Sequence, residues 1–110
     1  MKDFLVLFRE PDGRTEPHPE EDVKKHQAHW REWMLFATEQ GKLTGGKALT
    51  LNGKVIRDGR IYNGAYIVKE KELVGGYLLI KAGDIAEAAE LIKTCPAFEF
   101  GGFAEIRECM

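Results

Sequence analysis

Two stretches of the chain, residues 4–8 and residues 77–80, are apolar without interruption. A strand with one face in water alternates apolar and polar residues, whereas a strand covered on both faces reads as a continuous apolar run. Both stretches contain aromatic or branched side chains, which favour strands. The turn residues 11–13 follow the first stretch. We therefore predict two strands that need cover on both faces.

Between residues 19 and 40 the apolar spacing becomes helical. Pro19 suits the first turn of a helix, acidic residues 20–22 favour its positive end, and Gly41 ends it. At about 100° per residue, one face of this helix collects the large side chains. The members of that face are Val23, His26, Trp30, Trp33, Met34 and Ala37.

A second helix is predicted after Asp84, whose side chain is a natural N-cap, and it ends near Cys95 and Pro96. Its residues with core spacing are Ile85, Ala88, Ala89, Leu91 and Ile92. Residues 103–107 then alternate between apolar and polar positions, which is typical of a last strand.

Turn signals lie between the first helix and the second apolar strand. Asn52-Gly53 is a strong hairpin dipeptide, and we predict that it joins strands at residues 47–51 and 54–57. A second turn is predicted at Asp58-Gly59, and residues 60–62 extend the pairing after it.

The predicted order is therefore βαββαβ, the ferredoxin-like arrangement of an α+β domain, within a single domain of residues 1–110. Both helices of such a domain lie on one face of the sheet. The other face would expose an apolar patch that soluble monomers avoid, and two-fold pairing is the commonest solution. We therefore predict a homodimer packed sheet to sheet.

Composition and charge narrow the environment and the partners. The 110 residues carry 16 basic and 18 acidic side chains, with a formal net charge of −2, so neither sign dominates. This balance disfavours a nucleic-acid partner, and no apolar run reaches membrane-spanning length. Cys95 and Cys109 are predicted to be free thiols of a reducing compartment. With no signal peptide at the N-terminus, we expect a cytoplasmic protein.

Segments along nearly the whole chain resemble the DGPF, or YCII-related, domain family. They are FLVLFR at residues 4–9, WREW at 30–33, GKLTGG at 41–46, KELVGGY at 71–77, AGDIAEA at 82–88, CP at 95–96 and GGFAEIR at 101–107. The resemblance implies the dimeric α+β barrel variant of the ferredoxin-like fold. For the YCII branch it implies enzymatic activity through a His–Asp pair, and for other relatives an association with sigma factors.

The chain departs from this family at the signature itself. Residues 63–66 read Asn-Gly-Ala-Tyr where the family has Asp-Gly-Pro-Phe. An amide can form hydrogen bonds but cannot act as a general base. We therefore predict a homodimeric small-ligand-binding or accessory module. The alternative is a YCII-like enzyme in which His26 acts as acid or base with a nearby carboxylate, either Asp58 or Glu72.

The predicted site is a partly open pocket between the first helix and the signature loop. His26 would supply a titratable group, while Trp30 and Trp33 would supply aromatic surface, with Trp30 facing the sheet and Trp33 nearer the pocket. Asn63 and Tyr66 would orient a ligand through an amide and a phenol. The competing interpretation makes His26 a histidine at the edge of the core that is hydrogen-bonded to backbone.

Three further sequence features give weaker indications of function. His26 and His29, with Asp22, have metal-ligand spacing, but no further cysteine or histidine completes a site, so no metal and no cofactor is predicted. The glycine pairs at residues 45–46 and 75–76 indicate either close approach of a ligand or bends in the sheet. The chain contains no serine, which excludes a serine nucleophile.

Overall fold

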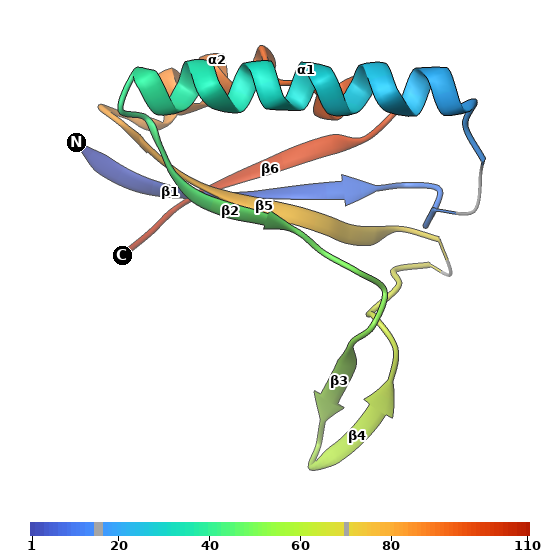
Figure 1. The fold of residues 1–110 in the computed structure, drawn as a ribbon. Coiled ribbons are helices and arrows are strands. Elements are labelled where there is room, and N and C mark those ends of the chain that lie inside the picture. Colours follow the sequence, from blue (N-terminus) through green and yellow to red (C-terminus); the bar gives the residue numbers. More distant parts are fainter. Residues whose placement is uncertain (15–16, 70) are drawn as a thin grey trace.

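The computed structural model describes residues 1–14, 17–69 and 71–110. The elements in chain order are β1 (Lys2–Glu10), α1 (Glu20–Glu39), β2 (Leu43–Ala48), β3 (Lys54–Arg57), β4 (Arg60–Asn63), β5 (Leu73–Ala82), α2 (Ile85–Lys93), the short 3-10 helix η1 (Pro96–Phe98) and β6 (Phe103–Glu108). Four strands form one antiparallel sheet in the order β2-β5-β1-β6, and both helices cover the same face (Figure 1). The predicted ferredoxin-like α+β fold is confirmed.

The two long helices begin and end where local chemistry predicts. Pro19 precedes α1, whose first turn is acidic, and Gly41 follows it with a left-handed φ of 71°. Asp84 caps α2, because its Oδ1 accepts the Glu87 N–H at 2.8 Å. In the three ranges that the structure describes, no helix combines the length and the apolar character needed to cross a membrane.

The hydrophobic core lies between the sheet and the two helices. Phe4 and Val6 of β1 are fully buried there, and their cross-strand partners on β5 are Ile80 and Leu78. The helices contribute Trp33, Ala37, Ala88, Leu91 and Ile92 to the same cluster. Two predicted core positions are wrong, because Met34 is 37% exposed and Ile85 is 52% exposed. Ile85 is the first residue of α2, and Met34 lies at the edge of the inner face of α1, beside a cavity.

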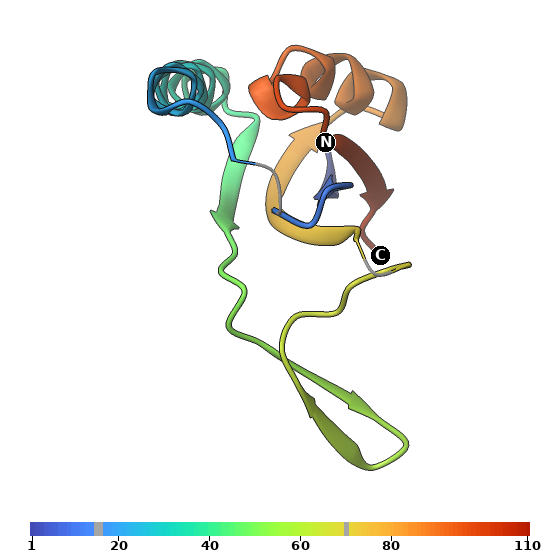
Figure 2. The ribbon, with the colours of Figure 1, turned by 90° about the vertical axis from the view of Figure 1, so that its right-hand side faces the viewer.

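The opposite side of the sheet carries the alternate side chains of the same strands. Leu5 pairs with Leu79, and Leu7 pairs with Tyr77, so an apolar band crosses the two middle strands. In the described part of the chain, both helices lie on the other side, and Leu79 is 39% exposed (Figures 1 and 2). We call this surface the bare face. Its apolar band explains why residues 4–8 and 77–80 do not alternate.

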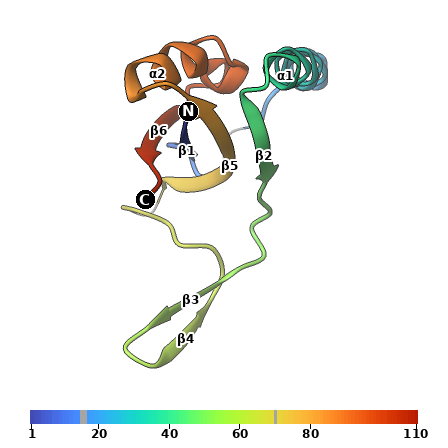
Figure 3. The ribbon, with the colours of Figure 1, turned by 90° about the vertical axis from the view of Figure 1, so that its left-hand side faces the viewer.

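Strands β3 and β4 form a separate two-stranded sheet that projects away from the helices (Figures 2 and 3). We call residues 49–68, which include both strands, the arm. Its turn is Asp58-Gly59, with φ of +52° and +74°. The predicted Asn52-Gly53 hairpin is wrong, because β2 pairs with β5. At the base of the arm the Gly53 carbonyl instead accepts the N–H of Gly64 at 2.7 Å.

Candidate functional site

A cavity of about 660 Å³ opens between α1 and the sheet. Its walls include Phe8 of β1 together with Trp30 and Met34 of α1, and its floor includes Gly46 of β2 and Gly76 of β5. The rings of Phe8 and Trp30 meet edge to face, with centroids 5.4 Å apart. Aromatic walls around an open space are typical of small-ligand sites.

The glycine pairs allow close packing at the sheet side of the cavity. Gly46 and Gly76 lie on the helix-facing side of the sheet, in register with Leu78 and Ala48 respectively. A Cβ at Gly46 would lie 2.6 Å from the Leu78 side chain, and one at Gly76 would lie 3.1 Å from a backbone oxygen of β2. Neighbouring atoms therefore fill the position of a side chain at both glycines, and neither position admits a larger residue without a shift. A register shift between Leu43 and Gly45 also makes β2 irregular here, which fits the predicted bend, whereas close approach of a ligand stays a prediction.

A chain of hydrogen bonds runs from the cavity wall to a carboxylate. The Trp30 indole Nε1–H donates to His26 Nε2 at 3.1 Å. His26 Nδ1 lies 2.8 Å from Glu99 Oε1, and His29 Nδ1 lies 2.7 Å from Glu99 Oε2. Glu99 belongs to the loop after η1, which packs against α1. One carboxylate is thus shared by two histidines that are one helical turn apart.

The direction of these bonds assigns the proton on His26. An indole nitrogen can only donate, so Nε2 of His26 is the acceptor and its ring proton resides on Nδ1. That proton is donated to Glu99, and both ring nitrogens are therefore engaged. His26 can take a proton from a ligand only if the Trp30 N–H first moves away. In this arrangement His26 fixes the orientation of the aromatic wall.

Hydrogen bonding also changes the acidity of Glu99. The bond from His26 is the largest cause that holds the pKa of this carboxyl below its usual range, and the bond from His29 adds to it. Glu99 is therefore ionised more readily than an isolated glutamate. It is the carboxylate that accompanies His26, in place of the predicted Asp58 or Glu72. Asp58 lies in the arm turn, and Glu72 faces Arg9 at 3.7 Å.

Relative to this cavity, the predicted positions of the two tryptophans are reversed. Trp33 is 7% exposed, belongs to the core cluster, and donates its indole N–H to Thr94 Oγ1 at 2.8 Å. Trp30 is half-buried and lines the cavity. The helical wheel placed both on the inner face, but it could not show that α2 packs beside Trp33 and that glycines lie opposite Trp30. His26 also lines this cavity.

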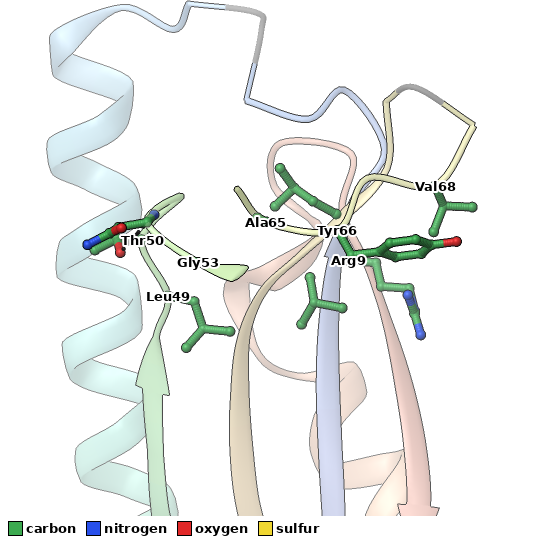
Figure 4. A pocket seen from close by; sticks show the side chains of 10 residues that line it. Arg9, Leu49, Thr50, Gly53, Ala65, Tyr66 and Val68 are labelled. Carbon is green, nitrogen blue, oxygen red and sulfur yellow. Dashed lines mark hydrogen bonds between the residues drawn. The ribbon is translucent and has the colours of Figure 1, made fainter. Parts of the chain in front are cut away.

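Asn63 and Tyr66 do not reach this cavity within one chain. Asn63 ends β4, and its Oδ1 accepts a hydrogen bond from Lys54 Nζ at 2.7 Å within the arm. Tyr66 is 56% exposed and lines a separate hollow of about 330 Å³ between the base of the arm and the sheet. Figure 4 shows that hollow, with Tyr66 and Arg9 on one side and Leu49 on the other. The predicted pocket shared by α1 and the signature loop is therefore not formed in the single chain.

Sequence reasoning missed Glu99 and the charged groups of the cavity. Arg14 donates through Nε to Glu10 at 2.6 Å and through its guanidinium to the Gly75 carbonyl at 3.1 Å. The one available signal for Glu99 is its place between Phe98 and Phe100, in a loop that this topology brings beside α1. In the described ranges, no group of three or more His, Cys, Asp or Glu side chains is arranged to hold a metal ion.

Comparison with known proteins concerns the family and the fold. Residues 4–108 match the family described as the YCII-related domain. No curated protein matches the chain. Among solved structures it is similar to 5-chloro-2-hydroxyhydroquinone dehydrochlorinase (TftG) from Burkholderia phenoliruptrix AC1100, in complex with 2,5-dihydroxybenzoquinone. The TM-score is 0.52 at 13% identity, over 98% of this chain and 93% of the other, so the likeness extends to the fold alone.

Proposed function

The chain belongs to the YCII-related domain family, and we propose that it is a homodimeric module that binds a small ligand between α1 and the sheet. One observation carries this proposal: an open cavity with aromatic walls lies beside a hydrogen-bond network. Small-molecule sites combine mostly apolar walls with a few convergent polar groups. Binding without chemistry fits His26 better than catalysis does, because both of its ring nitrogens are engaged.

The alternative proposal is a YCII-like enzyme that uses His26 as acid or base. The observation in its favour is Glu99, which lies within hydrogen-bond distance of His26 Nδ1 and could orient the ring as carboxylates do in catalytic pairs. For this role the Trp30 N–H must release Nε2, so that a ligand group takes its place. The binding proposal therefore requires the hydrogen bond from Trp30 to His26 to persist, and the enzyme proposal requires it to break.

Two substitutions at His26 separate these proposals. A screen of small aromatic compounds by thermal shift supplies a binding compound, and NMR then follows whether that compound is turned over. If His26 only holds Trp30 in place, His26→Ala weakens binding by roughly 1–2 kcal/mol, as expected for one lost hydrogen bond. His26→Gln, whose amide can still accept the indole N–H, restores part of that loss.

If His26 is instead the acid or base, both variants reduce turnover by roughly 10²–10⁴-fold and leave binding nearly unchanged. If the unmodified protein turns the compound over and neither His26 variant does, the binding-only proposal is rejected. A compound that binds without turnover, and binds more weakly to His26→Ala than to His26→Gln, would reject the enzyme.

We further propose that the homodimer, whose protomers are each one domain of residues 1–110, forms through the bare face and the arm. An isolated two-stranded hairpin is marginally stable in water. The arm nevertheless exposes a series of apolar side chains, which are Leu51, Ile56, Ile61, Tyr62, Tyr66 and Ile67. It leaves the sheet on the side of the bare face, so a second copy seated there would cover both apolar surfaces (Figure 2). In the competing proposal the chain has an accessory role, and another protein occupies this surface in place of a second copy.

Free thiols support a cytoplasmic location. Cys95 is buried in the core, Cys109 is exposed, and they form no disulfide with each other. Unpaired cysteines persist in reducing compartments, whereas secreted domains commonly pair theirs. We therefore propose the cytoplasm as the site of action.

A further inference from the structure

We infer that protonation of His26 releases the indole of Trp30, so that one wall of the cavity changes its position as pH falls. This inference goes beyond the proposed binding function, because it rests on the hydrogen bonds of the wall and not on any ligand. It is drawn from the two ring nitrogens of His26 and from the carboxylate of Glu99.

The two nitrogens of the His26 ring face partners of opposite kind. Nε2 accepts the Trp30 indole N–H at 3.1 Å, and Nδ1 lies 2.8 Å from Glu99 Oε1. A neutral imidazole satisfies both partners, because it offers one acceptor and one donor. The imidazolium form carries a proton on each nitrogen, so it still donates to Glu99 but cannot accept from Trp30. Protonation therefore sets two N–H groups against each other on the Trp30 side of the ring.

The carboxylate decides which of the two contacts is lost. A hydrogen bond between an imidazolium and an ionised carboxylate is roughly twice as strong as one between neutral groups. Glu99 is also held by His29, whose Nδ1 lies 2.7 Å from its other oxygen. The His26 ring therefore stays with Glu99, and the Trp30 indole is the group that moves. Because Trp30 lines the cavity and meets Phe8 edge to face, this movement changes the cavity wall.

The other ionisable groups beside His26 on the loop side are histidines and one aspartate. His29 shares Glu99, so its protonation competes for the same carboxylate. His18 stacks on Phe100 with centroids 4.1 Å apart, and the Phe100 ring in turn lies 4.6 Å from that of His26. Asp22 is exposed and lies one turn before His26 on α1. The three histidines of the chain thus gather around residues 99–100, and acid adds positive charge to this cluster.

On the cavity side, the ionisable groups that accompany His26 are Glu10, Arg14 and Arg31. Glu10 and Arg14 form an ion pair at 2.6 Å. Carboxylates and guanidinium groups ordinarily keep one charge between pH 5 and 8, whereas histidine is the side chain whose charge changes in that range. These groups are therefore a constant background to the change at His26.

The movement of Trp30 has a consequence for binding. A ligand seated against Trp30 would be held near neutral pH and released in acid. This consequence rests on the proposed binding function, whereas the movement itself does not. A test on the protein without ligand therefore decides the switch separately from the binding proposal.

The two tryptophans of the chain give such a test an internal control. Trp33 donates its indole N–H to Thr94 Oγ1 at 2.8 Å, and a hydroxyl does not titrate in this range. Proton–nitrogen NMR of the full chain records both indole signals from pH 8 to pH 5, and Trp30→Phe assigns them. We expect the Trp30 indole proton to shift upfield as its hydrogen bond is lost, together with the titration of the His26 ring protons. The Trp33 signal should stay in place.

Two variants identify the group that drives the shift. His26→Gln offers an amide oxygen that accepts the indole N–H at every pH, so the Trp30 signal should become independent of pH. The matched control is His18→Gln, which removes a histidine that stacks on Phe100 and has its ring contact there. In this control the Trp30 shift should persist.

A Trp30 signal that stays constant while the His26 ring titrates would overturn the inference. So would a shift that persists in His26→Gln, or one that the Trp33 signal follows, since the cause would then lie in another group or in a general change of the fold. If His26→Gln does not fold, the comparison of the two indole signals in the unmodified protein still decides.

Discussion

Glu99 connects the loop after η1 to the two histidines of α1. His26 and His29 share its carboxylate, and His26 in turn fixes the indole of Trp30. A single loop residue therefore connects the loop after η1 to the cavity wall. Its removal should loosen the wall even though Glu99 does not line the cavity.

The first prediction concerns pH and the variant Glu99→Gln. The pKa of Glu99 is lowered in the folded protein, chiefly by the bond from His26, so its ionised form stabilises the fold. A lowered pKa adds stability that is present above the unfolded pKa of about 4.3 and is lost as pH falls through the folded value. Urea unfolding should therefore find Glu99→Gln less stable than the unmodified protein at pH 7, and the difference should shrink by pH 3. A difference that is constant over this range would contradict the assignment.

The second prediction concerns the thiols. Cys95 is 5% exposed, and burial raises the pKa of its thiol, which disfavours the reactive thiolate. Cys109 is exposed. An aromatic disulfide reagent at pH 8 should label one thiol rapidly and the second only after unfolding. The double variant Cys95→Ala/Cys109→Ala should fold, at a cost of about 1 kcal/mol for the small buried cavity. A protein that fails to fold, or a native bridge between the two residues, would contradict this.

At the scale of elements, the arm has no cover of its own. Ile56 is 74% exposed and Ile61 is 66% exposed, although both lie in strands. In a lone chain, replacing such residues with threonine would be nearly neutral, since surface changes are usually within about 0.5 kcal/mol.

The third prediction follows from the proposed role of the arm in the dimer. Ile56→Thr/Ile61→Thr should shift the protein toward the monomer in analytical ultracentrifugation, because it removes apolar surface from the interface. The matched control is Ile85→Thr on α2, which is 52% exposed and lies on the helix layer away from the bare face. A dimer that is unaffected by the arm variant would remove the arm from the interface.

Elements whose signal is local could be predicted from the sequence. β1, α1, α2 and β6 each carry their own period and end signals, and the structure confirms them. In the arm, the predicted turn at Asp58-Gly59 is confirmed and the predicted hairpin at Asn52-Gly53 is wrong. The two dipeptides have equivalent turn chemistry, and only the pairing of β2 with β5 decides between them. Pairing across the chain is a tertiary property that neither dipeptide encodes.

The site was predicted only in part for the same reason. A helical wheel identified the inner face of α1, and with it His26 and Trp30, because that face depends on α1 alone. It could not rank Trp30 against Trp33, because their neighbours come from other elements. Glu99 lies in a loop without periodicity, about 70 residues from its partners, so no pattern within α1 points to it.

The whole molecule is more extended than its length requires. Its radius of gyration is 15.1 Å, whereas a compact chain of this length would have roughly 13 Å. The projecting arm accounts for the excess (Figure 3). An extended element beside an apolar sheet face is the shape that a two-fold pair would convert into a compact body.

The fourth prediction is the oligomeric state itself. Sedimentation equilibrium at micromolar concentration should give twice the chain mass of 12.4 kDa. Because a dimer gains stability by mass action, its melting temperature should rise with protein concentration. A monomer at micromolar concentration, with a melting temperature independent of concentration, would reject the homodimer.

The position of β1 in the sheet has a kinetic consequence. The first strand of the chain lies between β5 and β6, and Phe4 pairs with Ile80 on one side and Glu108 on the other. Long loops must close before these contacts form, so the chain loses conformational entropy before the contacts can stabilise it. Among the described elements, the helices and the β3–β4 hairpin form from neighbouring residues, whereas the strands of the large sheet do not. Until the second half of the chain arrives, the apolar side chains of β1 stay uncovered, and the cavity under α1 can be completed only after the long-range sheet has formed.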